Sequence, residues 1–213
     1  MKETFHNLAK EKRDRIIRAA LAEFAASGYE KATLDAVVQT AGISKGGLYE
    51  YISSKDDLFR YLLEYSYGAM YDFIIADDRE GTLPADPVER TRHIARKVVD
   101  YYLANPEIIT FLVKTSRVSD PVHRERVDSA FSDYFLRLFE TCDYSGIRFD
   151  PARIRSLLSW LLAKTRNDFT DALAGGNSPE TCRETYLGEW EFFFSVLTYG
   201  IYRGVSSVDK KEE

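Results

Sequence analysis

Apolar side chains recur along this 213-residue chain at the three- and four-residue intervals of an α-helix. In one segment they stand at positions 154, 157, 158, 161 and 162, which places them on one face of a helix. No stretch shows the sustained alternation of β-branched and polar residues, bounded by turn residues, that predicts a β-hairpin. The sequence therefore predicts an all-α protein.

The N-terminal part carries the start and stop signals of short helices. A first helix is expected over residues 10–27, where Gly28 ends it. Thr33 is a good N-cap for a second helix of about eight residues, which Gly42 ends. Ser44 caps the next helix directly after this turn.

The third helix, expected over residues 45–51, contains two adjacent glycines, Gly46 and Gly47. Each costs a helix roughly 1 kcal/mol relative to alanine, so their presence needs a reason. Two helices joined by a short glycine-containing turn, the second capped by serine, match a helix-turn-helix. The pattern alone also fits the start of an ordinary all-α domain.

A long helix follows these three. Ser53 and Ser54 offer caps for it, and it runs from Lys55 to about Ala76, or roughly 30 Å at 1.5 Å per residue. It leads into the rest of the chain, so we expect an N-terminal head of residues 1–54 and a helical body of residues 55–213. Further helices are expected at about 87–104, 106–116, 121–141, 151–173 and 179–204.

Charge is distributed unevenly along the chain. The net charge is -5, which by itself argues against a nucleic-acid partner, because Lys and Arg supply most of the affinity for phosphates. Residues 1–60 nevertheless hold ten Lys and Arg against nine Asp and Glu. Six of these positive charges fall in residues 1–18 and form a basic arm. The arm either reaches DNA, along the backbone or in a minor groove, or is a disordered, solubilising tail.

The last two long helices each have two apolar faces. In the final helix one stripe runs from Trp190 to Ile201, and Phe192, Val196 and Tyr199 form a second. One stripe suffices to pack a helix on its own domain, so a second implies a central position or a partner subunit, and we expect the partner. Two such helices from each of two chains would form a four-helix homodimer interface. The expected interface residues are Trp160, Trp190, Phe193 and Leu197.

Aromatic side chains in the body could line an apolar pocket for a small apolar or aromatic effector. Most of them, taken singly, fit an ordinary hydrophobic core better than a pocket. Polar residues 166–168 interrupt an apolar helix and would pair across a dimer, face water or contact a ligand. The candidate pocket residues are Tyr65, Met70, Phe73, Phe111, Tyr134 and Asn167.

Several classes of protein lack support in the sequence. No apolar run is long enough to span a bilayer and the N-terminus does not resemble a secretory signal, so a cytoplasmic location is expected. Cys142 and Cys182 have neither CxxC spacing nor histidine neighbours, and no metal or cofactor is expected. The spacings of P-loops, nucleophile elbows, dinucleotide-binding loops and zinc proteases are missing, so we expect no enzyme.

The segment "TLDAVVQTAGISKGGLYEYISSKDDL", residues 33–58, resembles the DNA-binding segment of the TetR family of transcriptional regulators. The preceding "RIIRAALAEFAASGYEKAT", residues 15–33, looks like the first helix and turn of that family. The resemblance covers about residues 10–60 and departs from the family pattern at Val38 and Ile52, which are apolar and expected inside. It implies a DNA-binding head and a body that dimerises and usually binds a small molecule.

Seven residues, six in the head and Lys55 at the start of the long helix, are expected at the DNA. The side chains of Lys45 and Tyr49, one turn apart, would reach base edges or phosphates. The family pattern has glycine at Gly46, where the lack of a side chain would allow close approach, and it constrains Gly47 less. Helix caps beside a duplex also point free N–H groups at phosphates, as the resemblance implies. The full set is Thr33, Ser44, Lys45, Gly46, Tyr49, Tyr51 and Lys55, the last two holding the DNA backbone.

The resemblance implies a sequence-specific transcriptional regulator, a repressor that a small-molecule effector releases from a palindromic double-stranded operator. For release, the effector must prefer one separation of the two heads. The alternative is a helix-turn-helix adaptor or DNA-organising protein without any effector, because the sequence does not establish a pocket.

Overall fold

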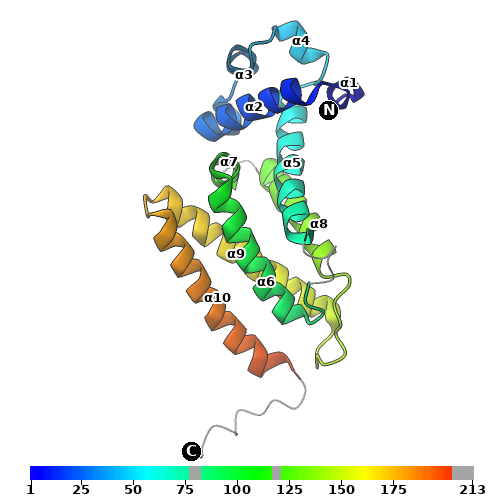
Figure 1. The fold of residues 1–213 in the computed structure, drawn as a ribbon, viewed down its shortest axis with the longest axis vertical. Helices are drawn as coiled ribbons and strands as arrows, with labels where there is room; N and C mark the ends of the chain where they lie inside the picture. The colour runs from blue at the N-terminus through cyan, green and yellow to red at the C-terminus, as the bar shows by residue number, and fades with distance from the viewer. Residues whose placement is uncertain (77–82, 117–120, 203–213) are drawn as a thin grey trace, which may run out of the picture. The chain divides into compact units, whose positions relative to one another are not determined.

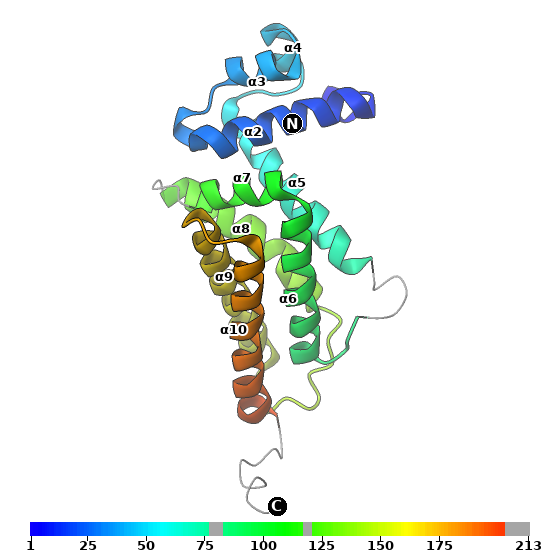
Figure 2. The same cartoon turned by 60° about the vertical axis from the view of Figure 1, so that its left-hand side comes forward.

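The computed structural model describes residues 1–76, 83–116 and 121–202, and within them the chain is all-α, as predicted (Figures 1 and 2). The predicted loop at 76–87 and the predicted end of the last helix near residue 204 fall partly or wholly outside these residues. The helices are α1 (Glu3–His6), α2 (Lys10–Lys31), α3 (Leu34–Ala41), α4 (Lys45–Tyr49), α5 (Lys55–Ile75), α6 (Pro87–Ala104), α7 (Pro106–Ser116), α8 (Pro121–Leu138), α9 (Pro151–Ala174) and α10 (Pro179–Ile201).

Side-chain caps fix where several helices begin. The hydroxyl of Ser54 accepts a hydrogen bond from the Asp57 N–H at 3.0 Å, at the start of α5. Asp150 and Ser178 do the same for α9 and α10 at 3.1 Å each, and a proline follows each cap. Because the first N–H groups of a helix have no partner inside it, these caps stabilise the starts that the sequence predicted.

Glycine marks the break in α2, as predicted. Gly28 has φ 73° and ψ 172°, outside the helical region, and the helix is kinked there. A side chain would strain this backbone conformation, which glycine adopts readily. Residues 29–31 form a short helical turn beyond the kink, before Thr33.

The described residues divide into two compact units. The first contains the described parts of Met1–Ala69 and Tyr102–Phe131, and the second those of Met70–Tyr101 and Ser132–Glu213. This division follows contacts within the chain and not function. The boundary between a DNA-binding head and a body at residues 54 and 55 therefore stays a prediction.

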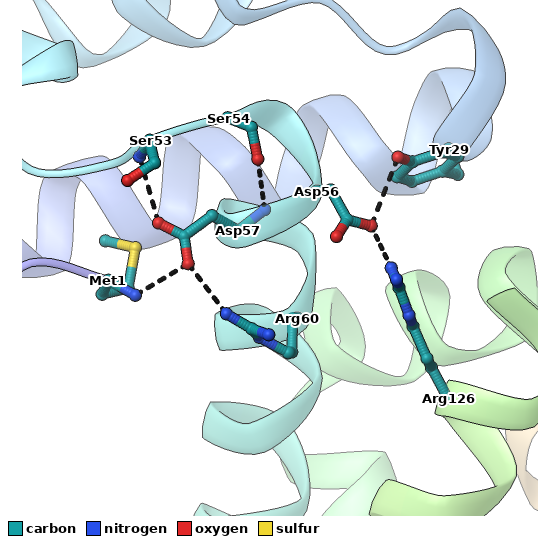
Figure 3. A network of polar contacts seen from close by, with 8 residues as sticks. All are labelled: Met1, Tyr29, Ser53, Ser54, Asp56, Asp57, Arg60 and Arg126. Atoms are coloured by element: carbon teal, nitrogen blue, oxygen red, sulfur yellow. Dashed lines mark hydrogen bonds and ion pairs between the residues drawn. The ribbon is translucent and has the colours of Figure 1, made fainter. Parts of the chain in front are cut away.

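An aromatic core holds the first unit together. Phe24, Phe59 and Phe111 are fully buried, with ring centroids 5.4 to 6.4 Å apart. On the same side, the carboxylate of Asp56 accepts hydrogen bonds from the Tyr29 hydroxyl and the Arg126 guanidinium, which links α5 to α2 and α8 (Figure 3). Within the head, α2 is thus packed on α7 and on the first part of α8.

The second unit contains α9 and α10, which run side by side (Figures 1 and 2). Buried Arg90 joins three parts of this unit, donating hydrogen bonds to the carbonyls of Pro84 and Leu138 and to the hydroxyl of Thr141. A buried guanidinium whose donors are matched in this way costs little.

Candidate nucleic-acid interface

The turn between α3 and α4 has the geometry of a helix-turn-helix. Gly42 ends α3 in the left-handed region, at φ 63° and ψ 41°. The N–H of Ile43 then donates to the carbonyl of Val38 at 3.1 Å, which satisfies one of the open carbonyls of α3. The chain turns within residues 42–44, and α4 begins directly afterwards.

The start of α4 is exposed and capped. The hydroxyl of Ser44 accepts a hydrogen bond from the Gly47 N–H at 3.1 Å, as expected of an N-cap. Lys45 and Gly46 are exposed, and Tyr49 keeps 41% of its surface accessible. A Cβ added at Gly46 would meet nothing within 4 Å. Packing inside the head therefore does not require glycine at this position, and the expected close approach of DNA stays a prediction.

Gly47 is more constrained than the sequence suggested. A Cβ at this position would stand 3.1 Å from the hydroxyl oxygen of Ser44, the atom that caps the helix. A methyl group here would push the cap aside by a few tenths of an ångström. The two glycines thus serve different purposes: the surface at Gly46 stays open, and Gly47 leaves room for the cap.

Lys45 lies next to an acidic residue of α3. Its ammonium group is 2.8 Å from the carboxylate of Asp35, and both side chains are mostly exposed. The hydrogen bond and charge of Asp35 raise the pKa of Lys45, so the side chain is fully charged at neutral pH. An exposed ion pair of this kind is weak, and Lys45 can leave it for a phosphate or a base edge.

Thr33 also lies on the exposed side. Its hydroxyl accepts a hydrogen bond from the Ala36 N–H at 3.2 Å, which caps α3 as predicted. Its own N–H donates to the carboxylate of Glu23 at 2.9 Å. The helix start at Thr33 is exposed, but this N–H is already occupied.

Tyr51 and Lys55 have structural contacts that the sequence did not predict. The ammonium of Lys55 donates to the carbonyls of Tyr29, Glu30 and Ala32 at 2.8 to 3.2 Å, just after the kink in α2. Tyr51 is only 7% exposed, and its hydroxyl accepts a hydrogen bond from Lys12. In this structure both residues hold the head together, and their expected contact with the DNA backbone stays untested.

The beginning of the basic arm is ordered rather than a disordered tail. The amino group of Met1 lies 2.9 Å from the carboxylate of Asp57, which also accepts hydrogen bonds from the Ser53 N–H and from Arg60 (Figure 3). Burial opposes ionisation of Asp57, but these donors outweigh it and lower the pKa of the carboxyl group. Asp57 therefore stays charged at neutral pH and anchors the N-terminal segment.

The six candidate pocket residues are divided between the two units, and their expected role in a pocket stays a prediction. Phe111 lies in the aromatic core of the first unit, where the exposed Tyr65 stacks on Tyr61 at 6.3 Å. Of those in the second unit, Met70 is buried and Phe73 is 39% exposed. Tyr134 is half-buried, and Asn167 is exposed and accepts hydrogen bonds from Arg166. Aromatic composition did not predict which of these side chains face the core.

The second unit has a small hollow between α9 and α10, of about 50 Å³. Ligand pockets usually measure roughly 300–1,000 Å³, so this hollow is of the size that holds water. The residues that line it include Thr165, Phe169, Cys182 and Tyr186.

Two of the four residues expected at the dimer interface on α9 and α10 are buried inside the unit itself. Trp190 and Leu197 are 1% and 4% exposed and belong to the core of the second unit, and Phe193 is only partly exposed. Trp160, by contrast, is 61% exposed. The second stripe of the final helix, Phe192, Val196 and Tyr199, is exposed, whereas on α9 the exposed apolar side chains are Trp160 and Leu157, the latter from the stripe expected inside.

Two features of the described residues bear on the class of protein. No helix among the described residues is long and apolar enough to cross a membrane. Over residues 1–76, 83–116 and 121–202, no three His, Cys, Asp or Glu side chains come together as metal ligands would. The fold and the exposed α4 define the chain as an all-α helix-turn-helix protein.

Comparison with known proteins finds a match in the N-terminal segment. Residues 16–62 match the family model "Bacterial regulatory proteins, tetR family", so this segment is similar to the DNA-binding segment of that family. The HTH-type transcriptional repressor NicS of Pseudomonas putida is 28% identical over 114 residues, which are 54% of this chain and 52% of NicS. The HTH-type transcriptional repressor SCO4008 of Streptomyces coelicolor is 35% identical over 98 residues, 46% of each chain. The chain thus spans about half the length of the curated relatives it matches.

Solved structures are similar over most of the chain. A TetR-family regulator from Syntrophomonas wolfei has a TM-score of 0.69 at 17% identity, covering 87% of this chain and 96% of the other. FadR from Bacillus subtilis, solved in complex with stearoyl-CoA, has a TM-score of 0.65 at 15% identity, covering 89% and 99%. At these identities the likeness shows the fold alone.

Proposed function

We propose that this chain is a sequence-specific DNA-binding transcriptional regulator, a repressor that acts in the cytoplasm. The observation that carries the proposal is the open, glycine-containing start of α4. Ser44, Lys45, Gly46 and Tyr49 stand there together on an exposed helix start directly after a helix-turn-helix turn. Free N–H groups and a cation at a helix start suit a phosphate-lined groove.

The matched relatives support this role. NicS and SCO4008 are named transcriptional repressors, and their similarity to this chain supports a regulatory rather than an enzymatic function. We extend the repressor role to this chain as part of the proposal.

The protein would bind DNA as a homodimer through the exposed apolar face of α9 and α10. Two large side chains on that face, Trp160 and Phe192, are 61% and 62% exposed, and a monomer gains nothing from displaying both on one face. A two-fold symmetric pair would place two copies of α4 on successive major grooves, about 34–36 Å apart, and would select a palindromic operator.

A small apolar or aromatic effector would release the protein from its operator. FadR, a protein of the same fold, was solved with stearoyl-CoA, which makes long-chain acyl compounds the first class to test. An effector must bind the DNA-free arrangement more tightly, since equal affinity for both states shifts nothing.

Selection of genomic fragments by the purified protein, followed by fluorescence anisotropy over a range of salt concentrations, tests the proposal. We expect enrichment of an inverted repeat and an affinity that falls steeply with salt, because several phosphates are contacted. Equal binding to all fragments at every salt concentration would contradict sequence-specific recognition.

The second candidate is a DNA-binding adaptor without an effector. The hollow between α9 and α10, about 50 Å³, is smaller than ordinary ligand pockets and does not itself support an effector site. Operator affinity measured with and without a panel of acyl-CoA and aromatic compounds separates the two. A compound that lowers affinity at least about tenfold, or roughly 1.4 kcal/mol, supports the regulator, and uniform affinity across the panel supports the adaptor.

A further inference from the structure

Helix α4 is too short to be stable by itself. It has five residues, and isolated helices need about 12–15 residues to form even with favourable sequences. The last carbonyl groups of any helix also lack partners within it. A helix that reads DNA must nevertheless keep one position, so something outside α4 has to support its C-terminal end.

The N-terminal segment supplies three donors to that end. The Lys2 ammonium donates to the carbonyl of Tyr49 at 2.6 Å, and the Thr4 hydroxyl donates to that of Glu50 at 2.6 Å. The backbone N–H of Lys2 donates to the carbonyl of Tyr51 at 2.8 Å. Three consecutive carbonyls at the end of α4 are thus satisfied by two residues that lie about fifty positions earlier in the chain.

The segment is itself held firmly. Phe5 is fully buried, with its ring 5.2 Å from that of Tyr61 and 6.1 Å from that of Tyr51. The guanidinium of Arg13 donates to the carbonyl of His6 at 3.1 Å. Together with the anchoring of the first residue by Asp57, these contacts fix the segment on both sides of Lys2 and Thr4.

We propose that residues 1–6 cap the C-terminal end of α4 and thereby position this helix for DNA recognition. Lys2, Thr4 and Phe5 would then set operator affinity as positioning residues that need not touch DNA. The cation of Lys2 also lies at the negative end of the α4 dipole, which favours the same position. The inference rests on the proposed function, because it assigns the cap a purpose in reading DNA.

This role differs from that of a flexible DNA-contacting arm in a measurable way. An arm that neutralises a phosphate contributes about one unit to the slope of log affinity against log salt. A cap changes affinity by changing how often α4 is correctly placed, and it leaves that slope unaltered. The buried ring of Phe5 can contribute only in the second way.

Hydrogen exchange of the α4 amides tests the cap without DNA. Thr4→Val keeps the shape of the side chain and removes its donor, whereas Thr4→Ser keeps the donor. We expect Thr4→Val to speed exchange of the Leu48 and Ile52 amides by about 5- to 10-fold, as for the loss of one hydrogen bond. Thr4→Ser and Glu3→Gln, a neighbour outside these contacts, should leave exchange unchanged. Equal exchange in Thr4→Val and the parent protein would overturn the cap.

Operator anisotropy on the same variants tests its purpose. Thr4→Val should weaken binding by a similar 5- to 10-fold factor with an unchanged salt slope, and Phe5→Leu should weaken it while circular dichroism stays that of the parent. Faster exchange without loss of affinity would overturn the positioning role. A Lys2→Met variant whose salt slope falls by about one unit, with α4 exchange unchanged, would make the segment a DNA arm instead. If the parent protein binds no operator, the proposed function fails, and the exchange result alone upholds or overturns the cap.

Discussion

The head and the α9–α10 pair both have clear sequence patterns, but they differ in whether neighbouring residues alone decide the structure. In the head, Thr33, Ser44 and Gly42 each perform the role that their residue type predicts, because a cap or a left-handed turn depends on the next few residues. In α9 and α10 the helices form as predicted, yet the apolar stripes do not say which one faces the core. The next few residues determine whether a polar residue caps a helix end. Which apolar face of a helix is buried depends on the packing of the whole unit.

The largest expected effect comes from the buried tryptophan of the C-terminal pair. Trp190→Ala should lower the free energy of unfolding by about 3–5 kcal/mol, because it empties a buried site in the second unit. Urea unfolding followed by circular dichroism measures this. A loss below about 1 kcal/mol, the range of surface substitutions, would mean that Trp190 is not a core residue.

A glycine in the head gives the next largest effect, on binding alone. Gly46→Leu should reduce operator affinity about 100-fold, or roughly 2.8 kcal/mol, because the new side chain would fill the space that the DNA needs. The melting temperature should change little, since a Cβ added at Gly46 would have no other atom within 4 Å. Gly47→Ala is the matched comparison, and it should cost less binding but some stability through the Ser44 cap. Identical effects of the two substitutions would show that the exposed side of α4 has been assigned wrongly.

The exposed tryptophan should behave in the opposite way to the buried one. Trp160→Ala should weaken the dimer by about 2 kcal/mol or more, as an interface anchor does, without destabilising the monomer. Sedimentation velocity over a dilution series reports the dimer constant. A dimer unaffected by Trp160→Ala and by Phe192→Ala would place the interface elsewhere on the chain.

A smaller effect is expected from the lysine that links α5 to α2. Lys55→Met removes hydrogen bonds to three carbonyls after the kink at Gly28 and should cost about 1.5–3 kcal/mol of stability, the range for bonds to a charged group. The salt slope of operator binding should stay the same. If instead the slope falls by about one unit and stability does not change, Lys55 contacts phosphate as the sequence first suggested.

The sequence predicted the helices, the similarity of the N-terminal segment to the TetR family and the exposed start of α4, since those depend on periodicity, caps and a local pattern. It missed the structural contacts of Lys55 and of the N-terminal segment, because both donate to carbonyls far away in the chain. The general rule that helix ends need donors predicts that such partners exist, but not which residues they are. The candidate pocket stays a prediction, because aromatic content does not reveal which rings pack on one another.

The central claim is that the exposed start of α4 reads DNA, and the Lys45→Met variant tests it most directly. Anisotropy would be measured on the selected operator and on a scrambled duplex, for the parent protein and the variant. We expect the variant to lose about 1–3 kcal/mol of discrimination between the two duplexes if Lys45 reaches a base edge, or one unit of salt slope if it reaches a phosphate. Unchanged affinity, discrimination and salt slope would contradict the assignment of α4 as the reading helix.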